Sequence, residues 1–221
     1  RDFTGAVGSM QTITKPAGVA YDEILLVGFG DKDKLTPLAL EENGGRIMAR
    51  LSDLGIKEAV MVMDLPDDTP FEAPEIAARI GFGGVLRDYR FDKYKTDHGK
   101  KADDDKKTKK DKTEKRLEKL KIITTGMASA KKLFADYEGV AKGVHIARDL
   151  VSEPANELYP ATYAKRCKEL TALGLEVEVL DHKALEKKGM KALLSVGEGS
   201  DRDSALVVMT YRGAEPAKSA S

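Results

Sequence analysis

The stretch ARDLVSEPANELYP, residues 147–160, decides how this chain is organised. Proline disfavours the helical conformation in the residue before it, so a helix that enters this stretch must end near Ser152 and Glu153. Pro160 is suited to the first turn of a new helix, where its missing N–H is not needed. The stretch therefore predicts a hinge between two helices.

The helix before the hinge is indicated by apolar side chains that recur at alternating spacings of four and three residues. They are Leu133, Tyr137, Val140, Val144, Ala147 and Val151. We expect a helix over residues 129–151, and about 20 helical residues span roughly 30 Å. A helix of that length is able to connect two domains.

The first part of the chain reads as strands and a helix in alternation. Residues 10–15 alternate polar and apolar, and the apolar run at 23–29 predicts a buried strand. Helical spacing follows over residues 40–54, closed by Gly55, and another strand is expected at 58–63. The order strand, helix, strand favours a βαβ unit with a mainly parallel sheet.

Two glycines, Gly44 and Gly45, fall inside that helix, where each costs about 1 kcal/mol relative to alanine. Close packing against a neighbouring backbone is the compensation we expect. Further along, we predict a helix at 74–86, an aromatic-rich strand at 89–94 and a strand at 120–125.

After the hinge, a helix begins at Pro160 and ends at Gly174, and an alternating strand covers 175–179. Asp181 is placed to cap a short helix. The final strand, 205–211, is apolar on both faces, which is typical of a strand inside a covered sheet. The buried face of the first helix is expected to carry Tyr163, Cys167, Leu170 and Leu173.

Composition bounds the possible partners. The chain has 37 Lys and Arg residues and 37 Asp and Glu residues. With no net charge, its overall electrostatic field does not favour binding to nucleic acid, membranes or acidic substrates. The single cysteine excludes an internal disulfide, and we expect a cytoplasmic protein. No apolar run approaches the roughly 20 residues needed to cross a bilayer. No signal-like pattern opens the chain. Because it begins at Arg1 without a methionine, we expect an internal segment of a longer protein.

Residues 95–119 are almost wholly charged and hold too few apolar side chains to pack, so a solvated insertion is expected. Asp103, Asp104 and Asp105 have lysines on both sides and are not preorganised for a cation. Phosphate contacts by the lysines are disfavoured by the interspersed aspartates and the absence of stacking aromatics.

The remaining candidates for chemistry favour structural roles. The histidines, His98, His145 and His182, form no metal-binding pattern, and Cys167 lies on a predicted buried face. Gly28 and Gly30 follow an apolar strand, but Asp33 stands where a dinucleotide fingerprint needs its third glycine. We expect a tight turn there. No self-contained catalytic, cofactor-binding or metal site is visible.

The chain resembles the leucine aminopeptidase (cytosol aminopeptidase) family. The resemblance is carried by EILLVGFG, NGGRIMARL, YRFDKYKT, GVHIARDLVSEPANELYP, LEVEVLDHKALEKKGMKALLSVGEGS and ALVVMTYRG, in order along the chain. It implies a cytoplasmic hydrolase that releases N-terminal residues such as leucine from peptides. It also implies two divalent metal ions, Mn²⁺ or Zn²⁺, and a homohexamer.

In that family the metal ligands and catalytic residues come after the strand matching residues 205–211. We therefore carry no catalytic, cofactor-binding or metal residue over to this chain, and we expect the 221-residue segment alone to be inactive. Asn156 and Glu157 are expected to make turn and capping hydrogen bonds. Gly197, Gly199 and Ser200 are likewise expected to be structural.

The resemblance implies an α/β fold in three parts. Residues 1–128 would form an N-terminal domain, incomplete at its start, with a mixed or mainly parallel sheet and helices on both faces. Residues 129–151 would be the connecting helix, and 152–221 the first part of a truncated peptidase domain. The competing hypothesis is a non-catalytic α/β module for subunit assembly or nucleic-acid contact.

Overall fold

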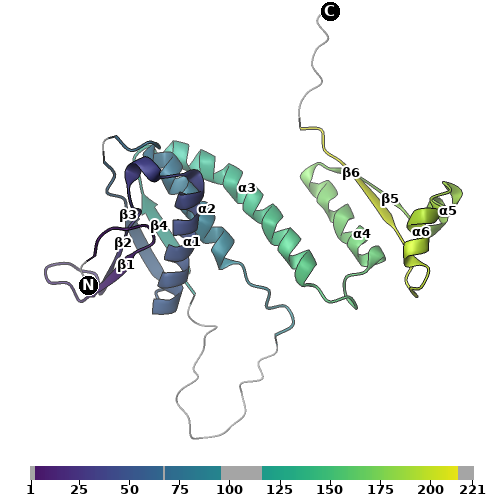
Figure 1. Cartoon of the computed structure of the whole chain (residues 1–221), viewed down its shortest axis with the longest axis horizontal. Helices are drawn as coiled ribbons and strands as arrows, with labels where there is room; N and C mark the ends of the chain where they lie inside the picture. The colour runs from purple at the N-terminus through teal and green to yellow at the C-terminus, as the bar shows by residue number, and fades with distance from the viewer. Residues whose placement is uncertain (1–2, 67, 96–115, 214–221) are drawn as a thin grey trace, which may run out of the picture. The chain divides into compact units, whose positions relative to one another are not determined.

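A computed structural model describes residues 3–66, 68–95 and 116–213. The chain divides into two compact units, Arg1–Asp149 and Leu150–Ser221, which are considered separately below. Figure 1 shows helices and short strands in both units, so the expected mixed α/β class is confirmed.

The first unit holds two strand pairs. β1 (Met10–Thr14) and β2 (Glu23–Val27) pair antiparallel, whereas β3 (Glu58–Val62) and β4 (Lys119–Ile123) pair parallel. In the described part of the chain these pairs are two separate two-stranded sheets, one antiparallel and one parallel, and no single sheet combines them. The strand that pairs in parallel with β3 is β4, not β2. After β3 the chain passes through the next helix and then returns beside β3 as β4.

Two helices, α1 (Pro37–Leu54) and α2 (Ala73–Asp88), follow the predicted spans. The Thr36 side chain accepts a hydrogen bond from the Ala39 N–H at 3.1 Å at the start of α1. Gly55 ends α1 in the left-handed conformation, with φ 75°.

The crossing of α1 and α2 is close enough to require glycine on both helices. A Cβ on Gly44 would lie 2.1 Å from the Ile80 carbonyl oxygen, and one on Gly83 would lie 1.8 Å from the Glu41 carbonyl oxygen. At Gly45 the nearest atom would be 3.5 Å away, an ordinary contact. The predicted backbone packing is therefore correct for Gly44, and its partner position is Gly83.

The main core lies between these helices and one face of the β3–β4 pair. The buried cluster consists of Leu40, Ile47, Leu51, Ile76, Ile80 and Leu117. Met61 and Ile122 pack against it, whereas Val60, Val62 and Ile123 on the opposite strand face are 45%, 72% and 57% exposed. The residues around 23–29 are half-buried rather than fully buried, because β2 borders only β1 in the described part of the chain.

The long helix α3 (Met127–Ser152) contacts α2 through large side chains. Tyr137 stacks on Phe82 with ring centroids 5.2 Å apart. Arg79 on α2 lies 5.3 Å from the Tyr137 ring and donates to Glu75 at 2.8 Å and to Glu41 on α1 at 2.7 Å. One guanidinium therefore links three helices.

The strand predicted at 89–94 is absent, and this prediction was wrong. Its aromatic side chains are used in contacts with α3 and with each other rather than in a sheet: the Tyr89 hydroxyl donates to Asp149 at 2.8 Å, and Phe91 lies beside Tyr94. The alternation of polar and aromatic residues in this segment suggested a strand, but a strand also needs a neighbouring strand to pair with. The segment has none among the described residues.

The second unit begins with α4 (Pro160–Glu169) and a 3-10 turn, η2 (Leu170–Leu173), closed by Gly174 at φ 88°. β5 (Glu176–Leu180) pairs antiparallel with β6 (Leu206–Thr210). Two short helices, α5 (His182–Lys187) and α6 (Lys191–Gly197), lie between them in sequence. Asp181 caps α5 as expected, accepting from the Ala184 N–H at 2.9 Å.

Two burial predictions for this unit were wrong. Tyr163 and Leu173 are 39% and 68% exposed, although Cys167 is buried. Val208 and Met209 on β6 are 42% and 46% exposed, so the apolar strand is not covered on both faces by the described residues. β6 has one neighbouring strand there, which leaves its second edge open.

Candidate functional site

The turn that joins α3 to α4 is held by an ion pair. Arg166 on α4 donates through Nη2 to Glu153 Oε1 at 2.6 Å, and the Glu153 side chain is only 3% exposed. A carboxylate this deeply buried needs a charged partner with good hydrogen-bond geometry. The pair therefore holds the turn at Glu153 against the body of α4.

Backbone hydrogen bonds complete this turn. The N–H groups of Glu157 and Leu158 both donate to the Pro154 carbonyl at 2.9 Å. The Thr162 hydroxyl donates to the Glu157 carbonyl at 2.7 Å and accepts from the Tyr159 N–H at 3.0 Å. Glu157 thus makes turn hydrogen bonds through its backbone as expected, whereas the start of α4 is capped by Tyr159 and Thr162.

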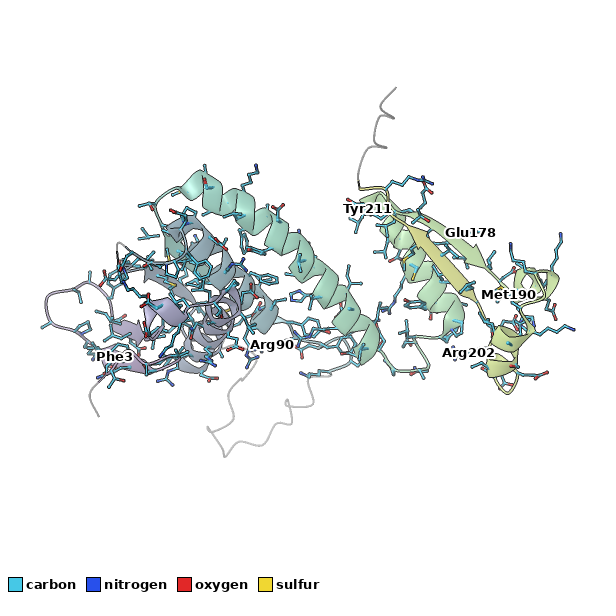
Figure 2. All side chains as sticks on the ribbon, turned by 45° about the horizontal axis from the view of Figure 1, so that its top comes forward. Phe3, Arg90, Glu178, Met190, Arg202 and Tyr211 are labelled. Atoms are coloured by element: carbon cyan, nitrogen blue, oxygen red, sulfur yellow. The ribbon has the colours of Figure 1, made fainter. Side chains whose placement is uncertain are left out.

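The loop before β6 contacts the start of α4 through Arg202 and Tyr159. The Arg202 guanidinium lies 3.6 Å from the centroid of the Tyr159 ring, and Figure 2 marks Arg202 on this loop. Ser200 donates its N–H to the Gly197 carbonyl at 3.0 Å and accepts from the Arg202 N–H at 3.1 Å. Ser200 and Gly197 therefore have the structural role expected of them.

A shallow hollow of about 380 Å³ lies in the second unit between α4, the start of α5 and the loop before β6. It is lined by Ala161, Ala164, Lys165, Lys168, Val179, Asp181, His182, Asp203, Ser204 and Ala205. His182 Nε2 is 3.6 Å from Glu186 Oε1, and its buried Nδ1 has no hydrogen-bond partner within the described ranges. Because the Asp181 carboxylate caps α5, the lining provides no preorganised acid, base and nucleophile set.

Cys167 is 4% exposed, as expected for a core thiol. Its hydrogen bond with Tyr163 raises the pKa of the Tyr163 phenol above its usual value. A nucleophilic thiol needs exposure and an electropositive environment, so this cysteine has a packing role.

His145 lies in a polar cluster of the first unit that the sequence did not reveal. Its ring centroid is 5.2 Å from that of Tyr89, and the Arg148 guanidinium lies 3.9 Å from the Tyr89 ring. Arg148 also donates to the Leu86 carbonyl at 3.1 Å. His145 is half-buried, and its Nε2 atom has no hydrogen-bond partner among the residues that the structure describes.

In the turn that contains Gly28 and Gly30, the backbone N–H groups of both glycines donate hydrogen bonds to the segment before β1. The Gly28 N–H donates to the Ser9 carbonyl at 2.8 Å, and the Gly30 N–H donates to the Gly5 carbonyl at 2.9 Å. Gly30 has φ 76°, a conformation that favours glycine. The tight turn expected at Gly28 and Gly30 is therefore present, and the N–H groups of both glycines are hydrogen-bonded within the protein.

Within residues 3–66, 68–95 and 116–213, no group of three or more His, Cys, Asp or Glu side chains is arranged to hold a metal ion. His98 and the aspartates at 103–105 lie outside those ranges, as does most of the charged insertion. None of the helices in the described part is long and apolar enough to cross a membrane.

Two family models match the chain in order. The N-terminal domain of the cytosol aminopeptidase family matches residues 1–98, and the catalytic domain of the same family matches residues 145–221.

Curated relatives agree with these matches. A probable cytosol aminopeptidase of Rhizobium johnstonii is 39% identical over 201 residues, which is 91% of this chain and 38% of the relative. One of Rhizobium leguminosarum bv. trifolii is 41% identical over 212 residues, which is 96% of this chain and 40% of the relative. The chain thus spans about two fifths of the length of these relatives.

Solved structures share the fold. The bottromycin maturation enzyme BotP in complex with Mn superposes with a TM-score of 0.74 at 24% identity, covering 95% of this chain and 40% of that one. A tomato leucine aminopeptidase mutant superposes with a TM-score of 0.73 at 22% identity, covering 93% and 38%. At these identities the likeness shows the mixed α/β fold alone.

The fold is thus of the mixed α/β class that these solved structures share. The two family models and the relatives together show that the chain belongs to the cytosol aminopeptidase family.

Proposed function

We propose that this chain is part of a metal-dependent aminopeptidase that releases N-terminal amino acids, such as leucine, from peptides. The observation that carries the proposal is the match of both family domains, N-terminal then catalytic, to one chain. Curated relatives at 39% and 41% identity over more than nine tenths of the chain support it.

The proposed enzyme uses two divalent metal ions, Mn²⁺ or Zn²⁺. Manganese is supported by the Mn-bound structural neighbour, BotP. Paired metals in such a site activate water and polarise the scissile carbonyl. The described residues do not fit such a pair, because they hold no cluster of three suitable side chains. We propose that the ligands and the catalytic residues lie in polypeptide that follows residue 221, and this is supported by the relatives, of which this chain covers only 38% and 40%.

The proposed role of residues 1–221 is to supply structure. Residues 1–128 would form the N-terminal domain, 129–151 the connecting helix and 152–221 the first part of the peptidase domain. The buried Glu153–Arg166 pair and the Pro154 turn support this role, since they fix the start of α4 through groups that face the protein rather than a substrate. We further propose a cytoplasmic homohexamer acting on peptide substrates.

The test is hydrolysis of leucine p-nitroanilide by the natural protein, first stripped of metal with a chelator and then supplied with Mn²⁺ or Zn²⁺. We expect turnover that is lost on chelation and restored by metal. A blocked substrate, acetyl-leucine p-nitroanilide, is the matched control, because an aminopeptidase requires a free amine. Equal turnover of the free and blocked substrates, or no turnover of either, would contradict the proposal.

A further inference from the structure

Asn43 and Gly44 form an Asn-Gly pair inside α1, at the crossing of this helix with α2 (Figure 1). Both residues are buried, and Asn43 has no exposed surface. Neither amide atom of the Asn43 side chain has a hydrogen-bond partner in the part of the chain that the structure describes. Hydrogen bonding to these residues therefore does not account for a polar side chain at this core position.

Packing restricts the second member of the pair to glycine. A Cβ on Gly44 would lie 2.1 Å from the carbonyl oxygen of Ile80, which is backbone and has no flexible end that could move aside. The facing residue of α2, Gly83, has the same requirement, because its Cβ would lie 1.8 Å from the carbonyl oxygen of Glu41. The contact between α1 and α2 thus requires a glycine directly after Asn43.

An asparagine that is followed by glycine is chemically labile. The backbone nitrogen of the glycine attacks Cγ of the asparagine side chain and closes a five-membered succinimide ring. The bond from Cγ to the side-chain nitrogen breaks, and ammonia leaves with the proton from the backbone N–H. Water then opens the ring and leaves aspartate or isoaspartate. Glycine favours the ring closure because it has no Cβ and its backbone adopts conformations that other residues avoid.

The folded helix blocks this reaction at Asn43. Inside an α-helix each backbone N–H donates to the carbonyl four residues earlier, so the Gly44 nitrogen is engaged in a hydrogen bond. The Cα–Cβ bond of Asn43 tilts toward the helix N-terminus, away from that nitrogen. Solvent does not reach the side chain. The pair therefore reacts only when this part of α1 loses its helical conformation and leaves α2.

We propose that Asn43–Gly44 is a site of spontaneous deamidation, which the contact between α1 and α2 protects and which separation of the two helices exposes. The inference goes beyond the proposed function and does not depend on it. It assigns a covalent modification, with water as the co-reactant, to a pair of residues whose packing keeps the reactive sequence in place.

The product does not fit the closed crossing. A carboxylate at residue 43 would be a buried charge at a position where the amide has no partner among the described residues. Arg79, a part-buried guanidinium on α2, is already bound to Glu75 and Glu41. Isoaspartate would in addition lengthen the main chain inside a helix. Molecules that react while open therefore lose the ability to repack α1 against α2 as before.

The experiment follows deamidation at residue 43 by peptide mass spectrometry in the natural full-length protein at mildly alkaline pH. A synthetic peptide of residues 38–49 gives the rate of the same pair without the fold. We expect the folded protein to react at least about a hundredfold more slowly, which corresponds to an opening free energy of about 2.8 kcal/mol. Urea below the unfolding midpoint should accelerate the reaction in proportion to the opened fraction.

A pair of glycine variants tests whether the helix crossing is the protecting element. Gly83→Ala should accelerate deamidation by about tenfold or more, because the added Cβ forces α2 away from Glu41. Gly139→Ala is the matched control, since a Cβ there meets nothing within 4 Å, and it should not accelerate the reaction. If Gly83→Ala does not fold, residue 43 should react at the rate of the peptide.

A second measurement supplies the product directly. Asn43→Asp should lower the midpoint of urea unfolding, whereas Asn156→Asp, in the exposed turn after α3, should leave it unchanged. Three results would overturn the inference: a folded protein that deamidates at residue 43 as fast as the peptide, a rate that responds neither to urea nor to Gly83→Ala, or an Asn43→Asp protein as stable as the parent.

Discussion

Arg166 Nη2 lies 2.6 Å from Glu153 Oε1, and this ion pair ties the turn after α3 to the middle of α4. The carboxylate is almost fully buried, whereas the guanidinium is 31% exposed. Removing the cation would leave the carboxylate buried without this partner, which is far more costly than losing a surface pair.

We therefore expect Arg166→Leu to lower the free energy of unfolding by about 2–4 kcal/mol. The matched control is Lys142→Leu, which removes an exposed pair with Glu138 and should cost less than about 0.5 kcal/mol. Urea unfolding followed by circular dichroism measures both. Equal effects of the two substitutions would show that the Glu153 pair is no more important than a surface contact.

The α1–α2 crossing gives a second prediction. Gly83→Ala places a Cβ 1.8 Å from the Glu41 carbonyl oxygen, and backbone atoms there can move only if the helices separate. We expect a loss of about 3 kcal/mol or more in the free energy of unfolding. Gly139→Ala, also inside a helix but facing open space, should instead gain about 0.5–1 kcal/mol. Thermal unfolding of the two variants should shift in opposite directions, and a stabilising Gly83→Ala would show that the crossing is looser than described.

Asn43 on α1 gives a third prediction. It has no exposed surface, and neither its amide nitrogen nor its amide oxygen has a hydrogen-bond partner among the residues that the structure describes. Replacement by leucine keeps a similar shape and removes the desolvation penalty of an unpaired polar group, which is about 1–3 kcal/mol. Asn43→Leu should therefore raise the midpoint of urea unfolding without changing the slope. A lowered midpoint would mean that the amide is paired in solution.

Tyr163 predicts a pH dependence at the alkaline end. Its hydrogen bond with Cys167 raises the pKa of the phenol in the folded protein above the unfolded value of about 10. The folded state then holds a proton that the unfolded state has released, so this contribution to stability is present below about pH 10 and is lost as the pH rises further. Between pH 9 and pH 11, stability should fall more steeply in the parent than in Tyr163→Phe. Parallel pH profiles would refute the coupling.

Features set by neighbouring residues were predictable from the sequence. Gly55 and Pro160 mark helix ends because backbone conformation at those positions depends on the residue itself. Asp181 was predictable as a cap for the same reason. The tight packing at Gly44 also followed, since a glycine inside a helix needs a compensating contact.

Features set by distant residues were not predictable. The Tyr89 hydroxyl donates a hydrogen bond to Asp149, which is 60 positions away in the sequence. The segment around Tyr89 is therefore not the strand that its alternating polar and aromatic residues suggested. The Glu153–Arg166 pair was missed because a Glu and an Arg 13 positions apart have no spacing signature when a turn lies between them. The exposure of β6 was missed because an apolar pattern predicts that a strand face is covered but does not say which part of the polypeptide covers it.

The most direct test of the central claim compares residues 1–221 with the natural full-length protein in one assay. Both are supplied with Mn²⁺ and leucine p-nitroanilide, and circular dichroism first confirms that the shorter chain is helical. We predict turnover by the natural protein and none by residues 1–221. Turnover by the folded shorter chain would contradict the account, because it would place a working catalytic site among residues to which we assign only structure.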